Sequence, residues 1–308
     1  MEFQQHTTVV ESLDSPALQK IDWPQIRSAA FMIHQRFHYR YPGQIQQLRQ
    51  RLMVVPPERH GDQRLVTHKL EISSPTTDVR REVDQFGNLS LNIAVDYVAR
   101  VIEFTVWLVV ERIADGSPIV VPATVANDPC FSQPSGLTEP GPMLLAAAAE
   151  LRASGATGQE LATRINTWVH QLMTYEHGTT DIWTTAEEAI VRRTGVCQDY
   201  SHVMIALCRL CDLPARYVSG HLLGEGATHA WVEVIVPDVD RPGRWQALPF
   251  DPTNGTVPAL HYISVATGRD YSDVAPTSGT FVAPFGGELI AGKRAGMVFL
   301  NHERTLPE

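Results

Sequence analysis

The fold is decided by residues 195–254, which contain the segments Gly195-Val196-Cys197-Gln198-Asp199-Tyr200, Thr228-His229-Ala230-Trp231-Val232-Glu233 and Phe250-Asp251-Pro252-Thr253-Asn254. A cysteine, a histidine and an aspartate thus follow one another along the chain, each at the edge of a different expected element. These are the side chains that a thiol nucleophile needs, because the sulfur requires a proton acceptor and the acceptor requires an orienting carboxylate.

The residues after Cys197 have the apolar period of a helix. We expect this helix to run from about Cys197 to Cys211 and to end at Asp212-Leu213-Pro214. Cys197 then lies in the first helical turn, where unpaired backbone N–H groups and the positive end of the helix dipole favour the reactive thiolate. The positions that share the apolar face are Tyr200, Val203, Met204, Leu207, Cys208 and Cys211.

Cys208 and Cys211 form a C-x-x-C pair, a spacing that is also found in zinc and redox sites. A zinc ribbon needs a second pair of this kind, and the sequence contains none. Both cysteines fall on the apolar face, so we expect them to pack in the core. For Cys197, the alternative to a nucleophile is likewise a small buried side chain with only a structural role.

Two extended runs follow the helix. Alternation of residues from His229 onward predicts a strand, and a second run from Arg244 to Asp251 follows a turn. An antiparallel register that pairs Val236 with Arg244 also pairs His229 with Asp251, which would put both side chains on one face. A slip of one residue would separate them, so the spacing permits a hydrogen bond between His229 and Asp251 without requiring it.

Four segments together resemble the bacterial transglutaminase-like superfamily. The resemblance implies a papain-like fold in which Cys197, His229 and Asp251 match the catalytic triad. Cys197 would attack an acyl carbon, His229 would move the proton and Asp251 would orient His229, with the Cys197 backbone N–H as one oxyanion donor. The segments are Gly195 to Tyr200, Pro214-Ala215-Arg216-Tyr217-Val218-Ser219-Gly220, His229 to Glu233 and Asp251 to Asn254.

A few other residues are candidates for roles near the triad. Animal transglutaminases use an upstream tryptophan as the second oxyanion donor, and Trp183 is the candidate here; the alternative is that Trp183 packs beside the helix that begins after Thr185. Asp199, His202 and Glu233 could shape the site, although Glu233 could equally pair with Arg216 across the sheet.

The remaining sequence predicts an α+β chain in several parts. Short strands between residues 29 and 115 indicate a β-sandwich-like domain, and the segments 39–42, 51–52 and 84–88 resemble the N-terminal region that precedes bacterial transglutaminase-like domains. Helical patterns then precede Cys197 and strands follow it. We expect an N-terminal extension (1–28), the β-rich domain (29–115), a linker rich in proline and glycine (116–142), the catalytic domain (143–290) and a C-terminal tail (291–308).

Composition limits the classes of function. The chain has 308 residues, 44% of them hydrophobic and 19% charged, which is enough for a large core. Its net charge of −9, without a basic cluster, argues against a nucleic-acid partner. We also expect no membrane span, because no apolar run reaches about 18 residues, and a cytoplasmic location, because four cysteines occur without an export signal.

We therefore expect a cysteine-dependent acyl-transfer enzyme that acts on a protein or peptide substrate, at peptide, isopeptide or glutamine amides, through a thioester. Neither a metal nor a cofactor is needed. Hydrolysis is favoured because water is abundant, whereas amine transfer needs a shielded acceptor tunnel that the sequence does not reveal. The alternatives are protein-glutamine gamma-glutamyltransferase cross-linking and a catalytically silent binding scaffold. The oligomeric state cannot be read from the sequence.

Overall fold

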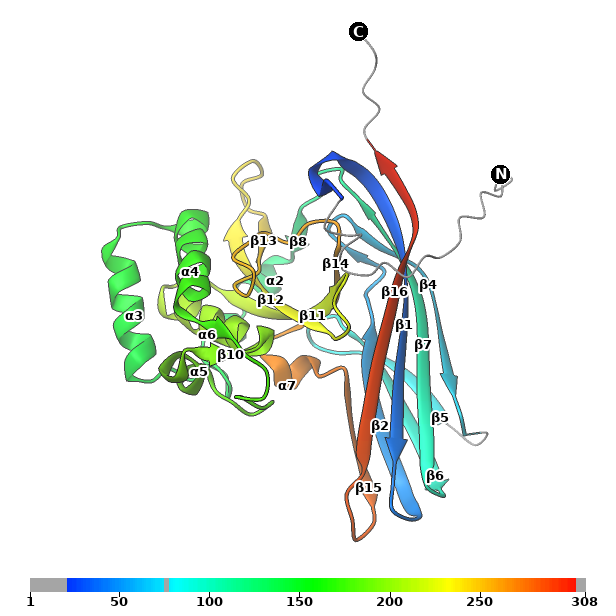
Figure 1. Ribbon diagram of the computed structural model, residues 1–308. Coiled ribbons are helices and arrows are strands. Elements are labelled where there is room, and N and C mark those ends of the chain that lie inside the picture. Colours follow the sequence, from blue (N-terminus) through cyan, green and yellow to red (C-terminus); the bar gives the residue numbers. More distant parts are fainter. Residues whose placement is uncertain (1–20, 75–77, 303–308) are drawn as a thin grey trace.

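The computed structural model describes residues 21–74 and 78–302 and has two halves, a strand-rich sandwich and a helix-rich half, which lie side by side (Figure 1). This arrangement confirms the α+β class and the β-sandwich-like N-terminal part. The longer helices lie on the side of the helix-rich half that is away from the sandwich, and strand β14 of its sheet lies against the sandwich (Figure 1).

The sandwich consists of two antiparallel sheets with the strand orders β16-β1-β7-β4-β3 and β15-β2-β6-β5. In β7 every second residue from Ile102 to Val110 is buried, as expected for a strand with one face on a core. The strands are β1 (Ile26–Arg40), β2 (Ile45–Val55), β3 (Arg59–His60), β4 (Gln63–Ile72), β5 (Asp78–Val83), β6 (Leu89–Val98), β7 (Val101–Ile113), β15 (Thr277–Val282) and β16 (Glu288–His302).

The two ends of the chain differ from the expected organisation. We expected a tail over residues 291–308, whereas Glu288–His302 forms β16 and pairs with β1 along its length. Only the part from Met297 to Leu300 has a strand-like pattern in the sequence. The rest of β16 escaped prediction because it is an edge strand that contains Gly292 and Gly296 and exposes Leu289 and Ile290, so its apolar period is weak. Of the expected extension 1–28, residues 1–20 lie outside the described residues, and β1 already begins at Ile26.

The helix-rich half surrounds helix α6 (Cys197–Leu210), whose residues from Gln198 to Arg209 are all buried. The other main helices are α3 (Pro142–Ala153), α4 (Gly158–Leu172) and α5 (Ala186–Arg192). Its sheet has the order β14-β11-β12-β13-β8, with β8 (Ile119–Val121), β11 (Ala215–Leu222), β12 (His229–Pro237), β13 (Trp245–Phe250) and β14 (Tyr262–Gly268). The short elements are α2 (Ala123–Ala126), η1 (Trp23–Gln25), η2 (Pro129–Phe131), α7 (Tyr271–Val274), β9 (Thr174–Tyr175) and β10 (Thr194–Gly195).

The segment that we expected to be a linker, residues 116–142, contributes structure to the helix-rich half. β8 pairs with β13 and completes one edge of the sheet, while Val121, Ala126 and Phe131 are buried in a small core with Ile235. The prolines of residues 116–142 therefore separate short structural elements, and the segment is not a flexible linker between domains.

The halves are joined where β14 would otherwise present a free edge. The Gln63 side chain donates to the Ser264 carbonyl (2.8 Å) and accepts from its N–H (2.9 Å). Asn88 makes the same pair of bonds with Thr267, at 2.8 Å each. Both amides are buried, so they satisfy the edge strand as a neighbouring strand would and fix the sheet against the sandwich.

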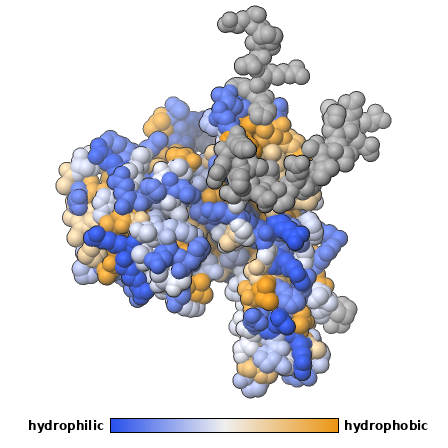
Figure 2. Space-filling view, in the orientation of Figure 1, coloured by the Kyte–Doolittle hydropathy of each residue, from blue (hydrophilic) through white to orange (hydrophobic). Residues whose placement is uncertain are grey.

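The surface of the helix-rich half is mixed in character. On the face shown in Figure 2, hydrophilic and hydrophobic residues are interspersed over the helices. This is the ordinary pattern of helices with one apolar face turned to a core. Within the described part of the chain, no helix is long and apolar enough to cross a membrane.

Candidate active site

Cys197 is the first residue of α6, as the sequence predicted, and the helix ends at Leu210 with Cys211 as its cap. The carboxylate of Asp199 holds this turn, because it accepts from the Val196 N–H (2.7 Å) and from the Thr180 hydroxyl (2.7 Å). Gly195 is required here, since a Cβ at this position would lie 2.5 Å from the Asp199 carboxylate. The first turn leaves backbone N–H groups without intrahelical acceptors beside the partly buried sulfur.

Cys208 and Cys211 lie in the helical core, as expected. Both are free thiols and both are buried. Burial raises the pKa of both thiols, so neither is disposed to react at neutral pH.

His229 and Asp251 meet across strands β12 and β13, although the register differs from the predicted one. Val236 pairs with Gln246 rather than with Arg244, a shift of two residues. Because an even shift keeps every side chain on its face, Asp251, which directly follows β13, still faces His229. Nε2 of His229 lies 2.8 Å from Oδ2 of Asp251.

Asp251 is fully buried and is surrounded by hydrogen-bond donors. Its Oδ2 accepts from His229, from the Tyr262 hydroxyl (2.8 Å) and from the Asn254 side chain (2.8 Å). Its Oδ1 accepts from the backbone N–H groups of Thr253 (2.9 Å) and Asn254 (3.2 Å). Burial raises the pKa of Asp251, but these bonds lower it by more, so the net shift is downward and the carboxylate is ionised at neutral pH.

The imidazole of His229 therefore has a defined orientation. An ionised carboxylate only accepts hydrogen bonds, so the proton between the two groups lies on Nε2 and leaves Nδ1 for the other partners. Burial lowers the pKa of His229, whereas its hydrogen bonds to Asp251, Cys197 and Glu225 raise it by more, to a value above that of ordinary histidine. His229 thus bonds to Asp251 through Nε2 and also interacts with Cys197, for which Nδ1 is the remaining ring nitrogen.

Two aromatic rings pack around this pair. Trp231 stacks on His229 at 6.2 Å between ring centroids, and Tyr262 contacts both rings at 5.9 and 5.5 Å. Gly220 makes room for them, because a Cβ there would lie 2.4 Å from the Trp231 ring and 2.2 Å from the Ile263 carbonyl oxygen. Only glycine fits at this position of β11, between the Trp231 ring and the backbone of Ile263.

Sequence reasoning missed Tyr262 and Glu225. Tyr262 begins β14, which is separated from β12 in the sheet by β11, so no local pattern relates it to Asp251. Glu225 lies in the loop between β11 and β12, where its Oε2 is 3.4 Å from Nδ1 of His229. No local pattern relates Glu225 to His229 either, because a spacing of four residues brings side chains together in a helix, whereas Glu225 lies in a loop and His229 begins a strand.

The other candidate residues lie around the triad. Trp183 is 70% exposed, and its neighbour Ile182 accepts from the Gln198 side chain (3.3 Å), so this segment borders the start of α6. Its oxyanion role stays a prediction. His202 is buried and accepts from the Tyr271 N–H (3.2 Å).

Glu233 pairs with Arg216 across the sheet at 2.6 Å, which is the alternative that we considered. It also contacts His60 of the sandwich at 2.6 Å. Burial raises the pKa of Glu233, but its two partners lower it by more than burial raises it, and the net pKa is about 2. Glu233 therefore links the halves through buried contacts with Arg216 and His60.

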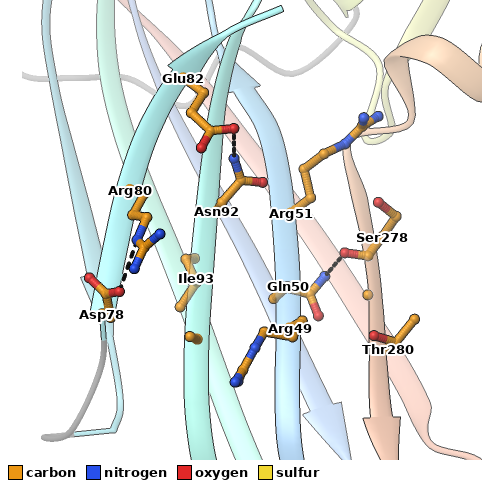
Figure 3. A pocket seen from close by; sticks show the side chains of 12 residues that line it. Arg49, Gln50, Arg51, Asp78, Arg80, Glu82, Asn92, Ile93, Ser278 and Thr280 are labelled. Carbon is orange, nitrogen blue, oxygen red and sulfur yellow. Dashed lines mark hydrogen bonds and ion pairs between the residues drawn. The ribbon is translucent and has the colours of Figure 1, made fainter.

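A pocket of about 700 Å³ lies on the outer face of the sheet β15-β2-β6-β5, and none of its lining residues belongs to the triad (Figure 3). Its polar groups bond to one another. Arg80 donates to Asp78 (3.1 Å) and Asn92 donates to Glu82 (2.9 Å) (Figure 3). This pocket is separate from the candidate active site.

Comparison with known proteins gives two family matches. The family described as the transglutaminase-like superfamily matches residues 146–252, and the bacterial transglutaminase-like N-terminal region matches residues 31–111. An uncharacterized protein of Mycobacterium tuberculosis is 31% identical over 285 residues, which cover 81% of this chain and 86% of that protein. A Mycobacterium leprae protein, also uncharacterized, is 36% identical over 124 residues, 37% of this chain and 42% of its own length.

A solved structure has the same fold. It is a Cytophaga hutchinsonii protein that is provisionally described as a cysteine protease, with 20% sequence identity and a TM-score of 0.66. The superposition covers 88% of this chain and 98% of that chain, so it includes both the sandwich and the helix-rich half.

Proposed function

The chain belongs to the transglutaminase-like superfamily, and on this premise we propose that it is a cysteine-dependent acyl-transfer enzyme that cleaves amides through a thioester. The observation that supports this proposal is the 2.8 Å bond between His229 Nε2 and the buried, ionised Asp251, which leaves Nδ1 for the Cys197 thiol. A scaffold that only binds a partner has no need of such an arrangement.

Acylation begins with proton transfer from the thiol to Nδ1 of His229. The Cys197 sulfur then attacks the amide carbon, the C–N bond breaks, and His229 returns its proton to the leaving amine. Asp251 stabilises the imidazolium and holds its tautomer throughout. The substrate is a peptide bond, an isopeptide bond or the side-chain amide of glutamine in a protein or peptide.

The oxyanion that forms during attack needs donors directed at it. The backbone N–H of Cys197, at the start of α6, is one proposed donor. The indole N–H of Trp183 is the proposed second donor, since its segment borders the same helical turn. Trp183→Phe should lower kcat more than it changes KM if the indole acts on the transition state.

The thioester can be resolved by water or by an amine. We favour hydrolysis, with His229 taking a proton from the attacking water, and retain protein-glutamine gamma-glutamyltransferase cross-linking as the alternative. Incubation with glutamine-containing peptides, with and without a primary amine, separates them by product mass. Cleaved or deamidated peptide supports hydrolysis, whereas amine adducts in their place would contradict it.

Iodoacetamide labelling tests the enzyme against a silent scaffold without knowledge of the substrate. Cys197 should be alkylated at neutral pH much faster than the buried Cys208 and Cys211. His229→Ala should remove this advantage. Slow labelling of all three cysteines at equal rates would favour the scaffold.

A further inference from the structure

The proposed mechanism gives no role to Glu225, although its carboxylate contacts His229, the residue that transfers the proton. Glu225 lies in the loop over residues 223–228, its side chain is 44% exposed, and its Oε2 is 3.4 Å from Nδ1 of His229. The loop is fixed, because the Glu225 N–H donates to the Leu222 carbonyl (3.3 Å) and Lys293 of β16 donates to the carbonyls of Leu222 and Ala227.

The position of Glu225 places it beside the part of the substrate that contains the leaving amine. In the proposed mechanism, Nδ1 of His229 delivers a proton to the amine that leaves the amide. A carboxylate beside Nδ1 therefore borders the amine half of the substrate. Its exposure leaves it open to a ligand from solvent.

Tyr175 lies near the nucleophile in the fold. It pairs with Gly195 in the β9–β10 ladder, two residues before Cys197, and the residue is 46% exposed. Burial raises the pKa of Tyr175 to about 12, and the negative charges of Cys197 and Glu225 act in the same direction. An exposed aromatic ring near the nucleophile suits a long cationic side chain, whose stem can lie on the ring while its charge reaches a carboxylate.

The charges nearby do not remove this preference. Lys293 is a basic neighbour of Glu225, but burial lowers the pKa of Lys293 to about 8, and its amino group is directed at the backbone, where it donates to the carbonyls of Leu222 and Ala227. The Asp251 carboxylate lies on the far side of the His229 ring, at Nε2. In the acyl-enzyme Cys197 carries no charge and His229 has given its proton to the leaving amine, so the Glu225 carboxylate, 3.4 Å from Nδ1, is available to a cation on the amine side.

We propose that Glu225 binds a positively charged group on the amine half of the substrate, so that the enzyme prefers amides whose leaving amine carries a basic side chain such as that of arginine or lysine. This inference rests on the proposed function. The amine that resolves a thioester occupies the position of the leaving amine, so the preference can be measured in either direction of the reaction.

The test uses p-nitrophenyl acetate, which acylates a reactive thiol without the natural substrate. The Cys197 sulfur bonds to the acetyl carbon, p-nitrophenolate leaves, and the thioester then reacts with water or with an added amine. In aminolysis the N–C bond forms, the C–S bond breaks, and His229 carries the amine proton to the sulfur. Equal concentrations of argininamide and citrullinamide compete, since these amines differ in the charge of the side chain but little in its shape.

We expect the wild-type protein to form about three to five times more acetylargininamide than acetylcitrullinamide, a ratio typical of one partly exposed ion pair. Glu225→Gln should bring the ratio to one, and Glu225→Lys should invert it. Glu160→Gln, on the exposed face of α4, is the matched control and should retain the wild-type ratio. A ratio within one reaction does not depend on the total rate or on the amount of folded variant.

The outcomes distinguish this inference from the function beneath it. If acetyl-Cys197 forms but the wild-type ratio is one, if Glu225→Gln retains the preference, or if both amines fail to give adducts, the inference is wrong while the acyl-enzyme stands. If mass spectrometry finds no acetyl group on Cys197, the proposed function is itself refuted, and the inference with it.

Discussion

Asp251→Asn removes the charge behind His229 with almost no change in side-chain volume. The carboxylate accepts from three side-chain donors at Oδ2 and from two backbone N–H groups at Oδ1. The amide of asparagine can accept on one side only, so its NH₂ group must face donors on the other. If that group faces His229, the imidazole is driven to the tautomer with its proton on Nδ1, which cannot accept the thiol proton.

The size of the effect follows from the lost bond. A hydrogen bond to a charged group contributes about 1.5–3 kcal/mol, and each 1.36 kcal/mol is a factor of about ten. The thiolate–imidazolium pair of Cys197 and His229 should therefore become about 10 to 150 times less populated at neutral pH. The rate of Cys197 alkylation should fall by the same factor.

The assay follows alkylation of Cys197 by iodoacetamide between pH 6 and 10, with the labelled residue identified by mass spectrometry. The two proteins should differ most near pH 6.5 and converge near pH 10, where an ordinary thiol is ionised. Buried Cys208 reports unfolding in the same sample, because it is labelled only when the core opens. Identical pH profiles for the variant and the wild type, with Cys208 protected in both, would refute the role of Asp251.

Tyr262→Phe keeps the ring but removes a hydroxyl that donates to a buried, ionised carboxylate, so urea denaturation should show a loss of about 1.5–3 kcal/mol in the free energy of unfolding; an unchanged midpoint would count against this bond. Glu233→Gln leaves the buried Arg216 guanidinium without its counter-charge and should cost about 3–5 kcal/mol. Burial raises the pKa of Glu233, but the neighbouring histidine and arginine bring it to about 2, so its contribution to stability is present above about pH 4.5 and is lost as the pH falls towards 2. Acid titration followed by circular dichroism should therefore be shallower in this variant, and equal slopes would contradict the assignment. Gly220→Ala puts a Cβ 2.2 Å from a backbone oxygen and should cost about 1–3 kcal/mol and slow the alkylation of Cys197. Gly286→Ala meets nothing within 4 Å and is its control; equal effects of the two changes would remove the steric explanation.

The parts of the site that follow a local rule could be predicted from the sequence. The start of α6 at Cys197 follows from apolar period and helix-end chemistry, and the common face of His229 and Asp251 follows from alternation along strands. The predicted register of β12 and β13 was wrong by two residues, because the register depends on the length of the turn between Pro237 and Trp245, which the sequence pattern does not determine. The face survived this error because side-chain orientation repeats every two residues.

The parts that depend on distant segments could not be predicted. Tyr262 reaches Asp251 from β14, and His60 reaches Glu233 from the sandwich; no pattern within one segment encodes either meeting. The last strand has the same limitation. β16 is recognisable only beside β1, whose backbone it completes, since its own sequence mixes glycine with exposed apolar residues.

The return of the chain to the sandwich bears on the role of that half. Because β15 and β16 follow the helix-rich half in sequence but pair with β2 and β1, the helix-rich half is an insertion between sandwich strands. The sandwich in turn reaches the site: Lys293 of β16 fixes the loop of Glu225, and Gln63 completes the edge of β14, which carries Tyr262. A fragment without the sandwich would expose that edge and release that loop. The sandwich is therefore best understood as support for the orientation of His229 and Asp251, and the site as a property of both halves together.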